Sequence, residues 1–300
     1  MILKVLLPLI LIGLLASGCR SKQATKSKIR QFRTLDYVDV GQRLPHVRTP
    51  YVIELANQAK HLVFVGCNHT RDSTDRQVRI LQKLFAQLKP QIAFNEGGQV
   101  KPSLHYPSLM KAAFEAGETG CMKYLSDQTN IPLLNGDTPD SLEFAVALKY
   151  YPRQELYLYY VMERIVVPYL TVANQEQPFE PYFNDVVRSF VSHHFPLSAG
   201  EQSLAYFKAL YQQYMNRPFV LALTHDIEKF DYINGGDCHF CEVGRRSKMI
   251  RDSLLLIKLD QALDEHDRVM VSFGCGHALA VEPALHQLLA KKRKRLLLRH

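Results

Sequence analysis

Two short apolar runs near opposite ends of the chain constrain its fold more than any other feature. Residues 61–66 and 268–273 are apolar at most positions instead of alternating with polar residues, and a glycine closes each run. Continuous apolarity over so few residues is typical of a strand buried on both faces, as in a parallel sheet covered by helices on either side. We therefore predict an α/β fold with a mostly parallel central sheet flanked by helices.

Helical patterns alternate with further strand patterns between the two runs. Apolar residues recur at helical spacing over residues 78–88, and a strand pattern follows at 92–95, so this stretch predicts a strand–helix–strand unit. Another strand is expected over residues 131–135. We expect a single α/β domain over residues 46–300, with a helical insert at about 140–245.

Residues 1–18 are typical of a signal peptide. Lys4 precedes an apolar run over residues 5–15, and small residues then lead to Cys19. The run is shorter than the about 20 residues that a membrane-spanning helix needs. The segment Ala-Ser-Gly-Cys resembles the lipobox of bacterial lipoproteins, in which the cysteine is lipidated; the alternative is an N-terminal anchor helix. Arg20, not Asp, follows Cys19, which implies an outer-membrane lipoprotein of the cell envelope, facing the periplasm or the surface, if the host is Gram-negative.

The positive charge of the chain is concentrated at its two ends. The formal net charge is +8, and basic residues cluster within residues 19–45 and 291–295. We interpret residues 19–45 as a basic tether, because a lipid together with a polybasic segment holds a protein to an anionic membrane more firmly than a lipid alone. The expected partners are therefore the membrane and a small-molecule or peptide substrate, and not nucleic acid.

Four side chains that could carry chemistry follow the expected strands. His69 and His277 each lie three residues after the glycine that closes an apolar run, and Glu96 and Asp137 follow the other two strands. Ligands bind beyond the carboxyl ends of parallel strands, and consecutive strands, such as those before His69 and Glu96, are usually neighbours. Two histidines and one carboxylate are the ligands of catalytic zinc and related divalent metal sites. Each residue also has an ordinary alternative role in a loop, a turn or a helix cap.

Together these residues resemble the motifs of the TraB/TIKI/erythromycin-esterase/ChaN superfamily. That family carries two strand–Gly-x-x-His–helix units, a Glu that ends the strand after the first unit, and an Arg, often followed by Asn or Asp, on the helix before the second. The matching residues here are Gly66-x-x-His69, Glu96, Arg251-Asp252 and Gly274-x-x-His277. The sequence around the second motif looks like that of bacterial lipoprotein members. The resemblance covers about residues 60–100 and 245–290 and implies an α/β fold with both histidines and the Glu in one pocket.

The resemblance implies more than one function. TIKI members are divalent-metal-dependent proteases, erythromycin-esterase members hydrolyse a lactone with His and Glu, and ChaN members are outer-membrane lipoproteins that bind haem. We expect a metal-dependent hydrolase of an ester, amide or peptide bond, in which His69, His277 and Glu96 hold a divalent ion, or Glu96 or a histidine acts as general base. Arg251 is expected to stabilise an oxyanion or hold a substrate carboxylate. The alternative is a lipoprotein that binds haem or a metal without turnover, with the tyrosines within residues 157–169 offering a haem surface.

The cysteines leave several alternatives open. Cys67 and Cys275 each lie two residues before a motif histidine, and together with Asp137 they are candidates for additional pocket residues. We interpret the two cysteines as buried thiols, with a disulfide or a closed Cys₂His₂ zinc site as alternatives. Cys238 and Cys241 form a Cys-x-x-Cys pair, for which a local disulfide is expected and a metal site or a redox pair are the alternatives.

Overall fold

The computed structural model describes residues 32–57, 59–171, 177–235 and 238–297, and of residues 293–297 the backbone alone. The expected signal peptide, Cys19 and the first part of the expected tether lie outside these residues. Within the described part, no helix is long and apolar enough to cross a membrane.

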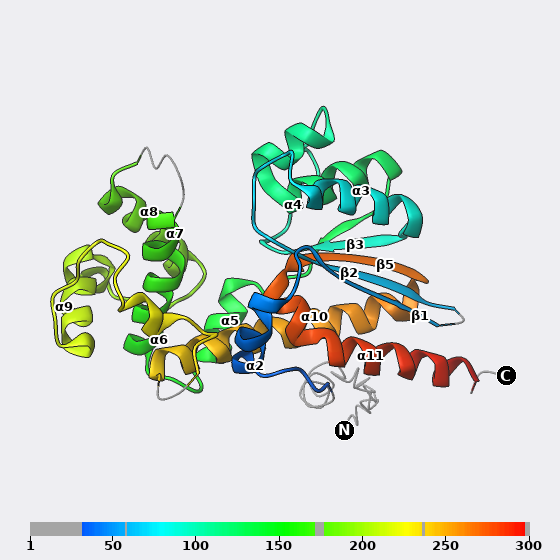
Figure 1. The fold of residues 1–300 in the computed structure, drawn as a ribbon. Coiled ribbons are helices and arrows are strands. Elements are labelled where there is room, and N and C mark those ends of the chain that lie inside the picture. The colour runs from blue at the N-terminus through cyan, green and yellow to red at the C-terminus, as the bar shows by residue number, and fades with distance from the viewer. Residues whose placement is uncertain (1–31, 58, 172–176, 236–237, 298–300) are drawn as a thin grey trace, which may run out of the picture. The chain divides into compact units, whose positions relative to one another are not determined.

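A five-stranded sheet forms the centre of the fold, in the order β1-β2-β5-β3-β4 (Figure 1). The strands are β1 (Tyr51–Ala56), β2 (His61–Cys67), β3 (Ile92–Asn95), β4 (Leu133–Asn135) and β5 (Arg268–Gly274). β1 is antiparallel to β2, and all other pairs are parallel. The predicted α/β class is confirmed. The expectation that β2 and β3 are neighbours is wrong, because β5 lies between them and pairs with both.

Helices cover both faces of this sheet (Figure 1). One face packs against α3 (Arg76–Leu88) and α4 (Leu109–Thr129), and the other against α10 (His239–Glu265) and α11 (Cys275–Leu297). Along β2, Leu62 and Phe64 belong to the core with α10 and α11, whereas Val63 and Val65 belong to the core with α3 and α4. Full burial of such a side chain contributes about 1.5–3 kcal/mol, so burial on both faces accounts for the continuous apolar pattern of the strand.

The first helix begins at a lower residue number than expected. Residues 19–45 were predicted as a tether, but α2 (Tyr37–Arg43) forms within them and the short helix η1 (Leu44–His46) follows directly. Asp36 caps α2 by accepting a hydrogen bond from the Val38 amide. Tyr37 and Val40 are fully buried against the N-terminal part of α11. The tether prediction is therefore wrong from Asp36 onward, since two anchoring side chains in a helix of seven residues leave too short a pattern to recognise.

The helical insert has its own core, rich in aromatic side chains. Its helices are α5 (Asp140–Ala147), α6 (Arg153–Val161), η2 (Met162–Val166), α7 (Val167–Thr171), α8 (Phe179–Ser192), η3 (Ala199–Gln202), α9 (Leu204–Met215) and η4 (Ile227–Phe230). Tyr157, Tyr159 and Tyr160 are at most 1% exposed and lie in this core. The turn η2 between α6 and α7 is π-helical.

Helix α10 joins the insert to the sheet. Its first half contributes Phe240, Val243 and Ile250 to the aromatic core of the insert, and its second half contributes Leu255 and Leu259 to the core beneath the sheet. The expected end of the insert, at about residue 245, falls within this first half of α10.

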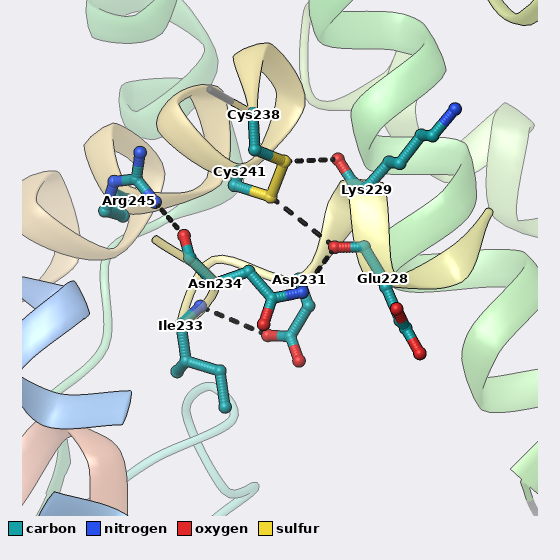
Figure 2. The surroundings of a disulfide bond; sticks show 8 residues. All are labelled: Glu228, Lys229, Asp231, Ile233, Asn234, Cys238, Cys241 and Arg245. Carbon is teal, nitrogen blue, oxygen red and sulfur yellow. Dashed lines mark hydrogen bonds between the residues drawn. A yellow bond between two sulfur atoms is a disulfide. The ribbon is translucent and has the colours of Figure 1, made fainter. Parts of the chain in front are cut away.

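The disulfide between Cys238 and Cys241 closes the start of α10 (Figure 2). Arg245, one turn further along α10, donates to the carbonyl of Asn234 in the preceding loop at 2.5 Å. The expected local disulfide is present. Cys67, Cys121 and Cys275 are buried free thiols.

Candidate functional site

The side chains of His69, Glu96 and His277 meet at the carboxyl ends of β2, β3 and β5. Nε2 of His69 lies 3.8 Å from Oε2 of Glu96, and Nε2 of His277 lies 3.6 Å from Oε1 of the same carboxylate. The insertion of β5 between β2 and β3 produces this arrangement, because it brings side by side the ends of the two motif strands and of the strand that precedes Glu96. Residues from both ends of the chain thus form one site.

Glu96 is held at the start of helix α11. The amide of Gly274 donates to Oε2 of Glu96 at 2.6 Å, and Arg251 donates to Oε1 at 2.7 Å. Burial alone would raise the pKa of Glu96, but the charges of His277, Arg251 and His69, together with the Gly274 amide, lower it to about 2. The carboxylate is therefore ionised at neutral pH.

Glycine at position 274 leaves room for the side chains that crowd against its backbone. A Cβ atom there would lie 2.9 Å from Nε2 of His69 and 3.2 Å from Oε2 of Glu96. Gly66, the glycine of the other motif, is needed for a different reason. A Cβ atom at Gly66 would lie 2.7 Å from Cβ of Ala278, so this glycine lets β2 pack closely against α11.

His69 is oriented by Glu118, a residue that the sequence did not indicate. Nδ1 of His69 lies 2.6 Å from Oε1 of Glu118, whose side chain is only 8% exposed. The hydrogen bond to Glu118 raises the pKa of His69, against the opposing effect of burial. Gly117, at φ +56°, breaks the helical geometry of α4 where it meets the carbonyl of Thr70, directly before Glu118.

His277 is oriented by Asp252 and Tyr37. Its Nδ1 lies 2.6 Å from Oδ1 of Asp252, and the hydroxyl of Tyr37 donates to Oδ2 of the same carboxylate at 2.8 Å. The Tyr37 oxygen also lies 3.0 Å from Nδ1 of His277. Burial raises the pKa of Tyr37 well above its ordinary value, so the hydroxyl keeps its proton. The motif resemblance indicates Asp252 only as the residue after Arg251, and Tyr37 falls in the expected tether.

Arg251 links Glu96 to Asp137. Its Nε donates to Oδ1 of Asp137 at 2.7 Å, and its Nη2 contacts both carboxylates. Burial opposes ionisation of Asp137, but the hydrogen bonds and charge of Arg251 lower its pKa. Arg251 and Asp252 occupy the point of α10 at which its packing changes from the insert to the sheet. The site therefore lies where the insert meets the sheet edge.

Cys67 and Cys275 do not join this site. Cys67 packs between the sheet and helices α3 and α4, with its sulfur 3.5 Å from Oγ of Ser272, and Cys275 packs against α2. Burial raises the pKa of both thiols. The two cysteines are buried free thiols, as expected, and their inclusion as pocket residues is wrong because both side chains point into apolar cores.

The donor set at the site fits a divalent metal ion by its chemistry. In each histidine Nδ1 is bonded to a carboxylate, so that when the ring is neutral its proton resides on Nδ1 and the lone pair of Nε2 faces Glu96. Carboxylate–histidine pairs of this kind orient histidine ligands in metal sites. Among the described residues, however, no three His, Cys, Asp or Glu side chains stand in a ready-made metal cluster, and Arg251 already neutralises part of the charge of Glu96.

A polar cavity of about 480 Å³ adjoins the site. Asp137 and Arg251 belong to its wall, which continues through Gly97 and Gly98 to the first residues of α5 and to η2. Arg251 therefore connects the cavity to the site, since it lines the cavity and also donates to Glu96.

No protein-family model, no curated protein and no solved structure matches this chain. The superfamily resemblance stays a prediction from the motifs.

Proposed function

We propose that this protein is a hydrolase of an ester, amide or peptide bond that uses a divalent metal ion, and that it acts in the bacterial cell envelope as a lipid-anchored protein. The observation that carries the proposal is the arrangement of the two Nε2 atoms around Glu96. Separations of 3.6 and 3.8 Å exceed the length of a hydrogen bond. When both rings are neutral, their Nε2 lone pairs and the carboxylate repel one another unless a cation or a shared proton lies among them.

In this proposal His69, His277 and Glu96 hold the ion, whose contribution is to make a water molecule a nucleophile at neutral pH. Glu118 fixes the ring of His69, while Asp252 and Tyr37 fix the ring of His277. These bonds keep both Nε2 atoms free to act as ligands, and they raise the electron density of the rings.

Arg251 supplies a positive charge that does not need to move during the reaction. Its Nε and Nη2 are held by Asp137 and Glu96, and among the described residues no hydrogen-bond partner takes Nη1. A fixed donor beside the reacting carbonyl stabilises the oxyanion that forms on attack, a contribution of about 2.7–4 kcal/mol in other enzymes. Glu96 is the alternative acceptor for the proton of the attacking water; its pKa of about 2 leaves it ionised but makes it a weak base.

The second proposal, haem binding without turnover, has less support from the geometry. The tyrosines expected to offer a haem surface include Tyr157, Tyr159 and Tyr160, and all three are buried in the core of the insert. The wall of the cavity beside the site is polar and charged, whereas haem needs an open apolar face. A Soret band on adding haem to the purified protein would favour this second proposal.

The proposed function is tested by elemental analysis of the purified protein and by hydrolysis of p-nitrophenyl acetate before and after chelation. Bound metal and hydrolysis should both fall strongly in His69→Ala and in His277→Ala. His105→Ala is the matched control, because His105 is an exposed histidine paired with a carboxylate, Asp127, outside the site. Unchanged metal content in the double variant His69→Ala/His277→Ala would reject the site.

The proposed location is tested separately. The protein should fractionate with membranes, and Cys19→Ala should release it. A Cys19→Ala variant that remains membrane-bound would contradict lipid anchoring.

A further inference from the structure

The cavity beside the site carries an unusual density of charge. Four carboxylates line it, and two guanidinium groups lie among them, with the Lys248 ammonium bonded to one of the acids from behind. The carboxylates are those of Asp137, Asp140, Glu143 and Glu163, and the guanidinium groups are those of Arg164 and Arg251. The acids that line the cavity thus outnumber its bases by four to two, while the ammonium groups of Lys248 and Lys258, which do not line it, bond to Glu163 and Asp137.

Arg164 is fully engaged with the wall of the cavity. Each of its three nitrogens donates to a carboxylate, with Nε on Glu163 at 3.1 Å, Nη1 on Asp140 at 3.0 Å and Nη2 on Glu143 at 2.7 Å. Its guanidinium also lies 4.5 Å from the centre of the Tyr160 ring. An anionic ligand would therefore compete with three carboxylates for this arginine.

The π-helical turn η2 creates this arrangement. It carries Glu163 and Arg164, and it lies between the α-helical segments α6 and α7. Single π-turns inside helices occur frequently at functional sites. Here the turn places an acid and a base side by side on the cavity wall.

Two acceptors on the wall have no hydrogen-bond donor among the described residues. Oδ1 of Asp140 is used by Arg164, but Oδ2 accepts no hydrogen bond within the described part of the chain, and Nδ1 of His193 lies 3.6 Å from it. Thr138 also lines the cavity and is only 5% exposed, yet its Oγ1 has no hydrogen-bond partner among the residues described. A buried hydroxyl without a partner costs about 1–3 kcal/mol, which a bound donor would recover.

We infer that this cavity binds the cationic end of the substrate, an ammonium or guanidinium group, while the bond to be cleaved lies over the His69–Glu96–His277 site. The cation donates to Oδ2 of Asp140 and to Oγ1 of Thr138. The positive end of α5 opposes this by about half a unit charge, which the full charges of the wall carboxylates outweigh. The inference rests on the proposed hydrolysis and specifies its substrate class.

A pair of isosteric esters tests the inference. The p-nitrophenyl esters of 6-aminohexanoic acid and of heptanoic acid have the same scissile bond and similar length, but only the first carries an ammonium group. We expect the cationic ester to be preferred by about tenfold in kcat/KM, the factor expected for a hydrogen bond to a charged group. The preference should appear mainly in KM and should weaken at high salt.

Two variants locate the preference in the cavity. Asp140→Asn keeps the shape of the side chain and should remove most of the preference, and Thr138→Val should reduce it by a smaller factor. Asp185→Asn is the matched control, because Asp185 is an exposed acid paired with Arg188 on α8. Equal kcat/KM for both esters, with hydrolysis that still requires His69, would overturn the inference while the proposed function stands.

Direct binding separates this inference from a failure of hydrolysis. Saturation-transfer NMR with pentylamine and pentanol should show contact for the amine alone, and Asp140→Asn should abolish that contact. The cavity would then bind a cation even if neither ester were cleaved, which would count against the proposed hydrolysis only. Absence of amine binding in the wild-type protein would overturn the inference.

Discussion

The two Gly-x-x-His motifs have the same sequence pattern but lie in different environments. After β2 the chain enters a loop, α3 begins only at Arg76, and the His69 side chain is 61% exposed. After β5 the chain enters α11 directly, so His277 lies in the first turn of that helix and its side chain is 8% exposed. One motif thus gives a histidine fixed in the interior, and the other gives a histidine open to solvent. The comparison suggests that His277 anchors the site and that His69 closes it on the solvent side.

Removing the carboxylate behind each histidine should expose this difference most clearly. Asp252→Ala removes the buried carboxylate that both the Tyr37 hydroxyl and Nδ1 of His277 contact and leaves them only their mutual contact, and a buried group left unsatisfied costs about 1–3 kcal/mol. We expect a loss of about 3 kcal/mol in the free energy of unfolding, measured in urea. Glu118→Ala should cost about 1 kcal/mol or less, because its partner is largely exposed. Equal losses would mean that the two environments are energetically alike.

Alanine substitutions at Gly66 and Gly274 should have different effects, the first on stability and the second on metal binding and hydrolysis. Gly66→Ala forces a Cβ atom against Ala278, and overpacking of this kind typically costs about 1–3 kcal/mol. Gly274→Ala instead presses on His69 and Glu96, so we expect metal affinity and hydrolysis to fall by about tenfold or more, as for other disturbances of ligand orientation. Urea unfolding and metal titration of both variants test the contrast. It fails if Gly274→Ala binds metal normally.

Tyr37→Phe should weaken the support of His277 without removing it. It removes one hydroxyl that donates to Asp252 while keeping the ring in its core. We expect a loss of about 1 kcal/mol in stability and a loss of about tenfold in metal affinity. Val40→Ala is the control for the stability of α2, since Val40 packs in the same cluster without touching His277 through a polar atom. A change in metal affinity of the same size in Val40→Ala would assign the effect to α2 as a whole.

The smallest expected effect is the pH dependence of the stability that the His69–Glu118 contact contributes. The bond to Glu118 raises the folded-state pKa of His69 above its ordinary value of 6.5. The contact therefore contributes its full stability below pH 6.5, and that contribution is lost as the pH rises through the folded-state pKa. In the metal-free protein, NMR titration should show the pKa of His69 falling in Glu118→Gln. An unchanged pKa would contradict the assigned role of Glu118.

The parts of the fold that the sequence revealed are those with local patterns. Burial of β2 and β5 on both faces produces the continuous apolar runs, and the glycine at the end of each strand follows from close approach of neighbouring atoms. The positions of His69, Glu96 and His277 at strand ends follow from the same patterns. Asp137 and Arg251 were also indicated, although their mutual bond was not.

The remaining parts depend on contacts between distant segments. The insertion of β5 between β2 and β3 is set by packing across the whole sheet and has no local signal. The role of Glu118 depends on a break in α4 at Gly117, which sits against Thr70. Tyr37 lies in a helix of seven residues within a basic segment. Only two residues of that helix are buried, which is too few for a recognisable apolar pattern. Each of these residues acts through a partner more than 40 positions away.

The most direct test of the site is a crystal structure of the protein grown with zinc, with the ion located by its anomalous signal. The account predicts one ion within about 2.0–2.2 Å of Nε2 of His69, Nε2 of His277 and a carboxylate oxygen of Glu96. Zinc bound elsewhere in the chain, with these three side chains left without it, would contradict the account.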